Sequence, residues 1–397
     1  MKAKRFRFDM LKKVGLHLGV DATNIRQGGG VTHLSKLLQA GDPIAAGISN
    51  VTVLANQETA AALPVRPWLT KVSSPWMEAL LPIRMLGQQF QLPRVIKAAR
   101  CDVLFSPGGT LPARLPVPAV TMSQNMLPFE PIEAARFGRW SLMRLKMQLL
   151  RHSQGRSFQR ADGLIFLSSY ARSVVTRALG GVPCFTALIP HGIENRFLHP
   201  PRLQRSLMEC TADNPFRVLY VSILMPYKHQ LEVARAASLL RAEGIPIELR
   251  FIGAPWGDYG HKFKALLDEL DPEHKFLLWS GAEPFESLHG FYKRSDAFVF
   301  ASSCENLPNI LIEAMAAGLP IASSGRGPMP EVLGDAGVYF DPEVSASIAK
   351  ALRDLAMDPS LRSKLALSAW HKAKAYSWER CAQDTFEFIA QAAKRDM

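Results

Sequence analysis

Short apolar stretches alternate with longer amphipathic stretches along the whole chain, and this alternation predicts strands and helices in turn. In the first 200 residues, helices are expected between several of the strands, for example over 31–40 and 171–179. The buried strands are expected over 15–20, 51–55, 103–105, 119–122 and 163–167. Strands that alternate with helices build a doubly wound α/β domain around a parallel sheet.

The same alternation starts again after a stretch with two prolines and an arginine, 199–202, which we interpret as a linker. Strands are expected over 217–222, 248–252, 276–279, 297–300, 320–322 and 338–340. Helices are expected over 229–243, 263–270, 286–294, 308–317, 345–357 and 360–375. The pattern therefore predicts two Rossmann-like domains with a cleft between them, and ligands of such sheets bind outside the carboxyl ends of the strands.

The composition is that of a globular protein, with 48% hydrophobic and 21% charged residues. No apolar run approaches the ~20 residues that span a bilayer. The short apolar stretch 14–20 follows basic residues in 2–13, and we interpret it as a first strand and not as a signal peptide. Five scattered cysteines without a C-x-x-C pair argue against a disulfide framework or a zinc site, so we expect a cytoplasmic protein.

The net charge of +12 is uneven, because residues 1–200 carry +15 and residues 201–397 carry −3. Such an asymmetry indicates that the N-terminal half faces something anionic. The densest segment, from Arg136 to Arg160, holds seven lysines and arginines, no acid, and many large apolar residues. On a helix, this mixture suits the headgroup region of an anionic membrane. It also fits a helix with an apolar side on the core and a basic side in water.

The segment 300–320 combines a buried strand, a polar loop and a helix that starts near Pro308. Proline suits the first turn of a helix, and the free N–H groups at a helix start favour a diphosphate. Two glutamates lie here with seven residues between them, Glu305 at the end of the strand and Glu313 inside the helix. Two carboxylates beside a diphosphate would accept hydrogen bonds from sugar and ribose hydroxyls. On spacing alone, such a pair is more often two solvated helix charges.

The residues around the two glutamates resemble the E-x₇-E motif of glycosyltransferase family 4, and the similarity continues through 281–297, 330–336, 340–342 and 376–379. The resemblance covers about 217–380 and is looser before that. It implies the GT-B fold, with two Rossmann-like α/β domains that face a central cleft. The first domain, 1–200, would bind the acceptor and the second, 201–378, the nucleotide sugar. A last helix in 379–397 would cross back to the first domain.

By this resemblance, Glu313 binds the ribose hydroxyls of the donor nucleotide and Glu305 contacts hydroxyls of the donor sugar. The diphosphate would lie on backbone N–H groups at the helix start, although Pro308 replaces part of a Phe-Gly pair that is frequent in the family. The remaining donor-binding residues are expected between the two glutamates: Asn306, Leu307, Asn309 and Ile310.

Lys228 closes a segment, 221–228, that resembles the phosphate-binding loop of the family. Its point charge would neutralise the departing diphosphate, so Lys228 and Glu305 are the expected catalytic residues. Ile223 stands where the family often has an arginine. Arg326 is a candidate for that missing cation, and a solvated loop charge is the alternative.

Three glycines, Gly28, Gly29 and Gly30, lie between a predicted strand and a predicted helix. Such a run lets backbone approach a phosphate or an acceptor closely, and it resembles the glycine-rich loop that faces the cleft in the family. Gln124 and Asn125 are expected on the acceptor side, where many family members carry a histidine. Retaining members do not need that base, because a donor phosphate oxygen can take the acceptor proton. His191 is expected to be a hinge or structural residue.

We therefore expect a retaining glycosyltransferase that moves a sugar from a UDP- or GDP-linked donor to a glycan or lipid-linked acceptor, in cell-surface polysaccharide or glycolipid biosynthesis. No metal or cofactor is expected, because the sequence has no Asp-x-Asp and no cluster of metal ligands. The protein would be cytoplasmic, with a possible peripheral contact to the inner membrane face through Arg136–Arg160. The alternatives are a GT-B sugar-nucleotide epimerase and a catalytically silent carbohydrate-binding scaffold. Nucleic-acid binding would explain the charge but neither glutamate.

Overall fold

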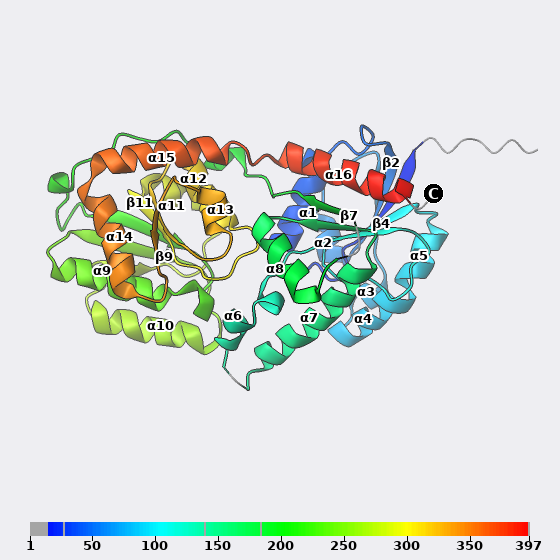
Figure 1. The fold of residues 1–397 in the computed structure, drawn as a ribbon, viewed down its shortest axis with the longest axis horizontal. Helices are drawn as coiled ribbons and strands as arrows, with labels where there is room; N and C mark the ends of the chain where they lie inside the picture. Colours follow the sequence, from blue (N-terminus) through cyan, green and yellow to red (C-terminus); the bar gives the residue numbers. More distant parts are fainter. Residues whose placement is uncertain (1–14, 27, 139, 183–184, 396–397) are drawn as a thin grey trace, which may run out of the picture.

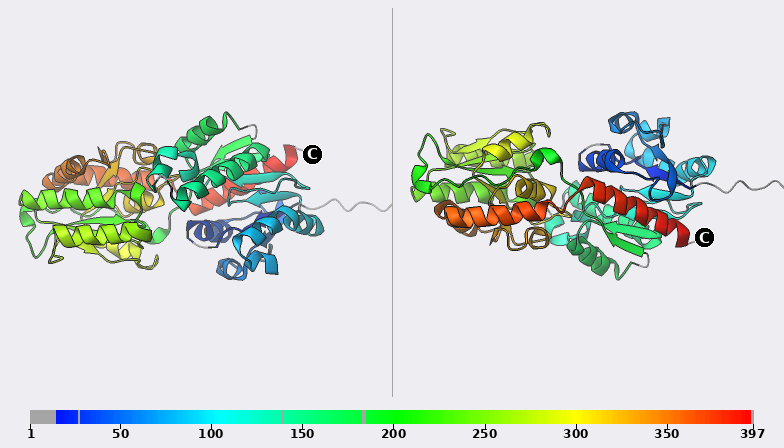
Figure 2. Two further views of the ribbon diagram at one scale, coloured as in Figure 1. Left: turned by 90° about the horizontal axis from the view of Figure 1, so that it is seen from below. Right: turned by 90° about the horizontal axis from the view of Figure 1, so that it is seen from above.

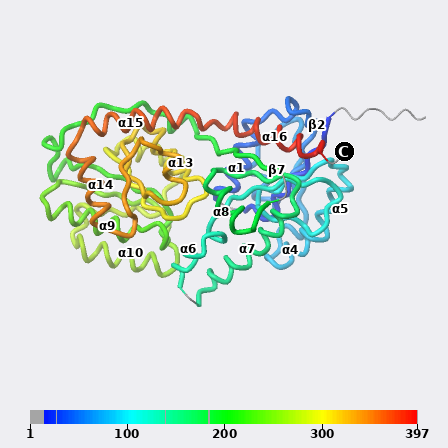
Figure 3. The backbone as a smooth tube through the Cα atoms, in the orientation of Figure 1, coloured from blue at the N-terminus to red at the C-terminus, as the bar shows by residue number. Residues whose placement is uncertain are grey.

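The computed structural model describes residues 15–26, 28–138, 140–182 and 185–395. Two α/β domains lie side by side along the long axis of the molecule (Figure 1), each built around one parallel sheet. The chain passes between them twice, once after the first sheet and once before the last helix (Figure 3). The doubly wound α/β architecture expected from the alternating pattern is confirmed.

The N-terminal sheet has seven strands in the order β3-β2-β1-β4-β5-β6-β7. Its strands are β1 (Leu16–Asp21), β2 (Ile48–Leu54), β3 (Leu69–Val72), β4 (Val103–Ser106), β5 (Ala119–Met122), β6 (Gly163–Phe166) and β7 (Phe185–Leu188). The central strands are buried on both faces, which is why they read as continuous apolar runs. The helices are α1 (Gly29–Ala40), α2 (Gln57–Ala62), α3 (Pro75–Glu78), α4 (Leu81–Phe90), α5 (Leu92–Ala98), α6 (Pro131–Ala135), α7 (Leu142–Arg160) and α8 (Ser169–Leu179).

The C-terminal sheet has six strands in the order β10-β9-β8-β11-β12-β13, the order of a Rossmann domain. Its strands are β8 (Phe216–Val221), β9 (Ile247–Ile252), β10 (Leu277–Trp279), β11 (Ala297–Phe300), β12 (Ile321–Ser324) and β13 (Val338–Phe340). Its helices are α9 (Gln230–Ala242), α10 (Gly257–Leu270), α11 (Leu288–Arg294), α12 (Asn309–Ala316), α13 (Met329–Leu333), α14 (Ser345–Met357) and α15 (Pro359–Ala373). The order reverses between β8 and β11, so the loops after these two strands flank the crevice where such sheets bind ligands.

The last helix, α16 (Trp378–Arg395), leaves the C-terminal domain and packs on the N-terminal sheet. Figure 2 shows α15 and α16 running one after the other across both domains. The ring of Phe388 stacks on Phe185 of β7 at 4.7 Å, and Phe386 lies so close to Gly41 that a side chain there would clash. The chain therefore ties the two domains together at a second point.

The basic segment that was expected to be one helix from Arg136 is interrupted. α6 ends at Ala135, Gly138 then has a φ of +96°, and α7 begins only at Leu142. Ser141 caps α7, because its hydroxyl accepts a hydrogen bond from the N–H of Arg144 at 3.2 Å. Among the described residues, no helix is long and apolar enough to cross a membrane.

Candidate functional site

Lys228 and Glu305 come from the two loops that flank the crevice of the C-terminal sheet. Lys228 ends a short 3₁₀ helix, Pro226–Lys228, after β8, and Glu305 lies in the loop after β11. The Nζ of Lys228 donates to a carboxylate oxygen of Glu305, and the side chains are 7% and 16% exposed. The structure thus brings the two expected catalytic residues together as an ion pair. A lysine ammonium has three N–H donors, so Lys228 can hold Glu305 and a phosphate at once.

Glu313 lies inside α12 and is buried. The hydroxyl of Tyr292, on α11, donates to its Oε2 at 3.0 Å. Burial raises the pKa of Glu313 to about 8, although the Tyr292 hydrogen bond lowers it. Within the described part of the chain, Tyr292 is the one hydrogen-bond donor to this carboxyl, which therefore keeps hydrogen-bonding capacity for a ligand.

A small interdomain cavity of about 40 Å³ brings Glu313 next to the N-terminal domain. Its lining comes from both domains and the segments that join them: Thr32, Gly192, Ile193, Glu194, Phe197, Phe285, Asn309, Ile312, Glu313 and Trp378. The arrangement is nearly closed, so a bound nucleotide would need the domains to separate and close again around it.

The start of α12 is partly occupied by protein contacts. The N–H of Asn309 donates to the carbonyl of Leu307 at 2.9 Å. In this arrangement the N–H is not free for the diphosphate contact that we expected of it. The Asn309 side chain is hydrogen-bonded to His191 at 3.1 Å. Among the described residues, the N–H of Ile310 has no acceptor outside the helix. Pro308 precedes the helix as its N-cap residue and leaves Ile310 as the better diphosphate contact.

Asn306 joins the domains instead of facing an open site. Its side-chain amide donates to the carbonyl of Ser123 at 2.7 Å, and its own carbonyl accepts from Ser168 at 2.7 Å. Leu307 is buried beside it. Cys304 packs among apolar residues of the N-terminal domain, including Phe129. The loop that carries Glu305 is therefore held in place by the opposite domain.

His191 lies at the junction of the domains in a cluster of three rings. The His33 ring lies 4.4 Å from the His191 ring, and the Trp378 ring lies 5.7 Å from His191 and 5.8 Å from His33, so the three rings contact one another. Burial lowers the pKa of His191 to about 4, so it is neutral at pH 7. A neutral, buried ring packed against two other rings fits a structural role.

The glycine run lies near the acceptor-side residues. Gly28 has a φ of +68° and precedes α1, and side chains at Gly28 or Gly29 would meet open space. A Cβ at Gly30 would lie 3.9 Å from the side-chain oxygen of Gln124. The Asn125 side chain instead accepts from the N–H of Leu127 at 3.1 Å, which closes a local turn.

Arg326 does not supply a free cation. Its guanidinium pairs with Asp341 at 3.0 Å and with Glu343, and Glu343 also pairs with Arg136 of the N-terminal domain at 2.6 Å. Two carboxylates already balance its charge, so the alternative of an ordinary loop charge fits better. Ile223 is 40% exposed.

A carboxylate cluster after β5 was missed from the sequence. Glu130 accepts from the hydroxyl of Tyr170 at 3.0 Å, and burial raises the pKa of Glu130 to about 7. Glu133 accepts from the hydroxyl of Ser303 at 2.5 Å, across the domain boundary. The available signal was a Pro-Phe-Glu-Pro-Ile-Glu run at a strand's carboxyl end, just after Gln124 and Asn125.

Glu331 of α13 caps a helix of the other domain. Its carboxylate accepts from the N–H groups of Ser169 and Tyr170, at 2.7 and 2.8 Å, in the first turn of α8. Loss of a cap costs about 1–2 kcal/mol, so we expect Glu331→Ala to shift the balance between closed and open domains about 5–30-fold towards open. Small-angle X-ray scattering would report a larger radius of gyration. Glu243→Ala, which changes an exposed glutamate of the same domain, should leave the radius unchanged; equal radii for both variants would contradict the prediction.

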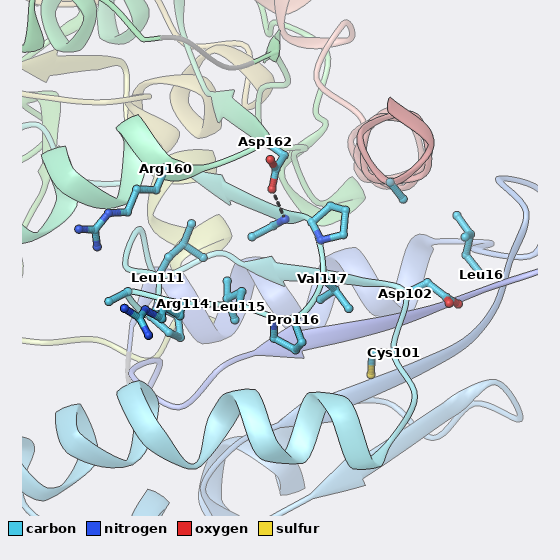
Figure 4. A pocket seen from close by; sticks show the side chains of 15 residues that line it. Leu16, Cys101, Asp102, Leu111, Arg114, Leu115, Pro116, Val117, Arg160 and Asp162 are labelled. Carbon is cyan, nitrogen blue, oxygen red and sulfur yellow. Dashed lines mark hydrogen bonds between the residues drawn. The ribbon is translucent and has the colours of Figure 1, made fainter. Parts of the chain in front are cut away.

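A larger cavity, of about 960 Å³, lies at the amino ends of the strands of the N-terminal sheet. It borders the residues just before or at the start of β1, β4, β5 and β6, where Asp162 accepts from the N–H of Ala119 at 2.7 Å (Figure 4). Ligands of doubly wound sheets bind at the opposite, carboxyl ends. We therefore place the functional site at the interdomain cleft.

Residues 210–370, which contain Lys228, Glu305 and Glu313, match the family model described as glycosyl transferases group 1. The C-terminal domain of the chain therefore carries the similarity to this family. A solved sucrose-phosphate synthase from Thermosynechococcus elongatus has the same fold, with a TM-score of 0.75 over 96% of this chain and all of that chain, at 17% identity. The expected GT-B fold is thus confirmed.

Two curated relatives of this chain are mannosyltransferases. The O-antigen chain mannosyltransferase B of Escherichia coli is 31% identical over 170 residues, which are 42% of this chain and 44% of that protein. The GDP-mannose-dependent alpha-(1-6)-phosphatidylinositol monomannoside mannosyltransferase of Mycolicibacterium smegmatis is 27% identical over 247 residues, 59% of this chain and 62% of that protein. The chain thus spans less than two thirds of the length of either relative.

Proposed function

We propose that this protein is a glycosyltransferase that moves a sugar, with retention of configuration, from a UDP- or GDP-linked donor to a glycan or lipid-linked acceptor. The match of residues 210–370 to glycosyl transferases group 1 supports transfer from an activated sugar. The observation that carries the proposal is the ion pair of Lys228 and Glu305 at the crevice. Glu305 lies in the loop that leads into α12, the helix of the buried Glu313.

In this proposal, Lys228 and the N–H of Ile310 bind the diphosphate and neutralise the charge that develops as it leaves. Glu305 positions the sugar through its hydroxyls, and Glu313 accepts hydrogen bonds from the ribose. The diphosphate is stabilised by these protein groups without a metal ion. The acceptor enters from the side of Gly28–Gly30 and Gln124, and a donor phosphate oxygen takes its proton.

The two mannosyltransferase relatives make GDP-mannose the first donor to test. Their names also favour an acceptor in cell-surface polysaccharide or glycolipid synthesis. An epimerase would need no acceptor site, and a silent scaffold would need no lysine beside a departing diphosphate.

Ligand-detected NMR with a panel of GDP- and UDP-sugars tests the donor site. We expect selective binding by the wild type and at least tenfold weaker binding by Glu313→Ala, because the ribose loses its acceptor. Glu269→Ala, which removes an exposed glutamate of α10, is the matched control and should bind like the wild type. If no nucleotide sugar binds, or if both variants behave alike, the donor-site assignment is wrong.

A further inference from the structure

The lower edge of the N-terminal domain in Figure 1 carries apolar side chains that no other part of the described chain covers. On α7, Leu142, Leu145 and Leu149 recur at i, i+3 and i+7, so they share one face of the helix. This face lies opposite the buried Phe158, and Leu142 and Leu149 are 85% and 64% exposed. Trp140, just before the helix, is also exposed. A stripe of this kind in water is unfavourable unless something binds it.

A second apolar face lies on α4. The helix is held on the domain by its other side, where Gly87 and Gln88 are buried and a Cβ at Gly87 would clash with the ring of Trp76. The exposure of the outer face is therefore a property of a packed helix and not of a loose one. Five side chains on it are half-exposed or more: Leu81, Ile83, Met85, Leu86 and Phe90.

The two helices are joined by the loop after β4. Gln89 of α4 accepts from the N–H of Ala113 at 2.8 Å, and Ser157 of α7 accepts from the N–H of Leu111 at 2.9 Å. Both helices lie at the same edge of the domain, and both are in view when the molecule is seen from below (Figure 2, left). We call their outward apolar residues the α4–α7 surface: Leu81, Ile83, Met85, Leu86, Phe90, Trp140, Leu142, Leu145 and Leu149.

The charge around this surface has one sign. The segments 81–100 and 142–160 contain nine lysines and arginines and no Asp or Glu. By helical spacing, Lys146 and Arg156 flank the leucine stripe of α7 on its exposed side. An apolar surface on two segments whose charges are all positive matches a layer of anionic headgroups over acyl chains, and an exposed tryptophan suits that boundary.

We propose that the α4–α7 surface docks the protein on a bilayer that contains anionic lipid. The leucines and aromatic rings enter the headgroup boundary, and the surrounding cations bind lipid phosphates. α6 precedes α7 and packs on it, and its Glu133 accepts a hydrogen bond from Ser303 of the C-terminal domain. Docking would therefore hold the cleft near the membrane, where a lipid-linked acceptor could reach it. This delivery of the acceptor rests on the proposed function.

Flotation with vesicles of phosphatidylcholine, with and without phosphatidylglycerol, tests the docking. We expect the wild type to float only with phosphatidylglycerol vesicles and to be released by added salt. The double variants Leu145→Ser/Leu149→Ser and Leu86→Ser/Phe90→Ser should each lower the partition coefficient about tenfold or more. Lys146→Gln/Arg156→Gln should lower it about tenfold at low salt.

Leu203→Ser/Met357→Ser is the matched control, because it removes two exposed apolar side chains elsewhere on the molecule. Absence of flotation, or equal losses for the control and the surface variants, overturns the proposal. The proposal is also overturned if the surface variants dissociate a dimer of this protein and leave vesicle binding unchanged, because the surface would then bind a second copy. If one of the two apolar double variants fails to fold, the other one still tests membrane docking.

Donor binding without vesicles separates this proposal from glycosyl transfer. The surface variants should bind nucleotide sugars like the wild type, because their side chains lie outside the cleft. A protein that floats but binds no nucleotide sugar would refute the proposed function and leave the membrane docking standing.

Discussion

Replacement of Lys228 by methionine should slow the release of nucleoside diphosphate from bound donor about 10²–10³-fold, the usual cost of removing one preorganised charge-stabilising donor. Lys228 lies where the strand order of the C-terminal sheet reverses, and its Nζ is already placed on Glu305. The charge on the departing diphosphate develops in the transition state, so the loss should fall on the rate more than on donor binding.

The rate is measured as nucleoside diphosphate produced from GDP-mannose, or from the donor that binds best, by the slow hydrolysis that needs no acceptor. Lys228→Arg keeps the positive charge and should recover part of the rate. Lys262→Gln, an exposed lysine of α10, should leave the rate unchanged. Equal rates for the wild type and Lys228→Met would remove Lys228 from the mechanism.

The same substitution leaves Glu305 without its ammonium partner, and breaking a largely buried pair can destabilise a protein by about 3–5 kcal/mol. Thermal unfolding must therefore accompany the rate measurement. A double variant, Lys228→Met/Glu305→Gln, removes both charges and should recover much of the stability of the single variant. It should not recover the rate, which separates catalysis from folding.

The fold could be predicted from the sequence because the physical signal is local. Strands buried on both faces, such as 103–106 and 163–166, read as apolar runs, and helices lie between most of them. Strand order is different, because it depends on how the crossovers place β4 and β8 in space. No periodicity along the chain contains that information.

The site was predictable where its residues follow strand ends. Lys228 and Glu305 are 77 residues apart, yet each follows a strand next to the crevice, so they meet. The contacts across the domain boundary were not predictable, because Asn306 and Glu331 bind partners 183 and about 160 residues away. The donor roles expected for the Asn309 N–H and for Arg326 stay predictions, and the sequence did not show that Leu307, Asp341 and Glu343 of the same domain already bind these groups.

The α4 face shows a further limit. An apolar helix such as 81–90 has the same composition whether it is buried or exposed, so the sequence pattern could not identify it as a surface. The interruption before α7 is set by the positive φ of Gly138, and a glycine in a basic, apolar stretch does not by itself announce a break.

Glu313 gives the second large expected effect, a loss of stability as pH rises. Its folded pKa of about 8 lies above the ordinary value of 4.5. Between these two pH values the unfolded chain is ionised while the folded protein keeps the proton, so the folded protein becomes less stable as pH rises through this window. Below pH 4.5 both states are protonated and the effect vanishes.

Glu313→Gln should remove this decline, because glutamine does not ionise and its oxygen can still accept from Tyr292. At pH 8 to 9 the variant should be more stable than the wild type by about 3–5 kcal/mol, and at pH 4.5 the two should be similar. Denaturant unfolding at several pH values measures the difference. Glu269→Gln should follow the wild-type curve, and parallel curves for Glu313→Gln and the wild type would contradict the prediction.

The same variant tests why a buried carboxyl is retained at a cost to stability. If ribose hydroxyls bind the ionised form, donor binding must release the proton, so wild-type affinity should rise with pH up to about 8. Glu313→Gln should bind the donor more weakly, with no such rise. A residue that weakens the empty protein but strengthens the complex belongs to the site, because its cost is offset only when the ligand is bound.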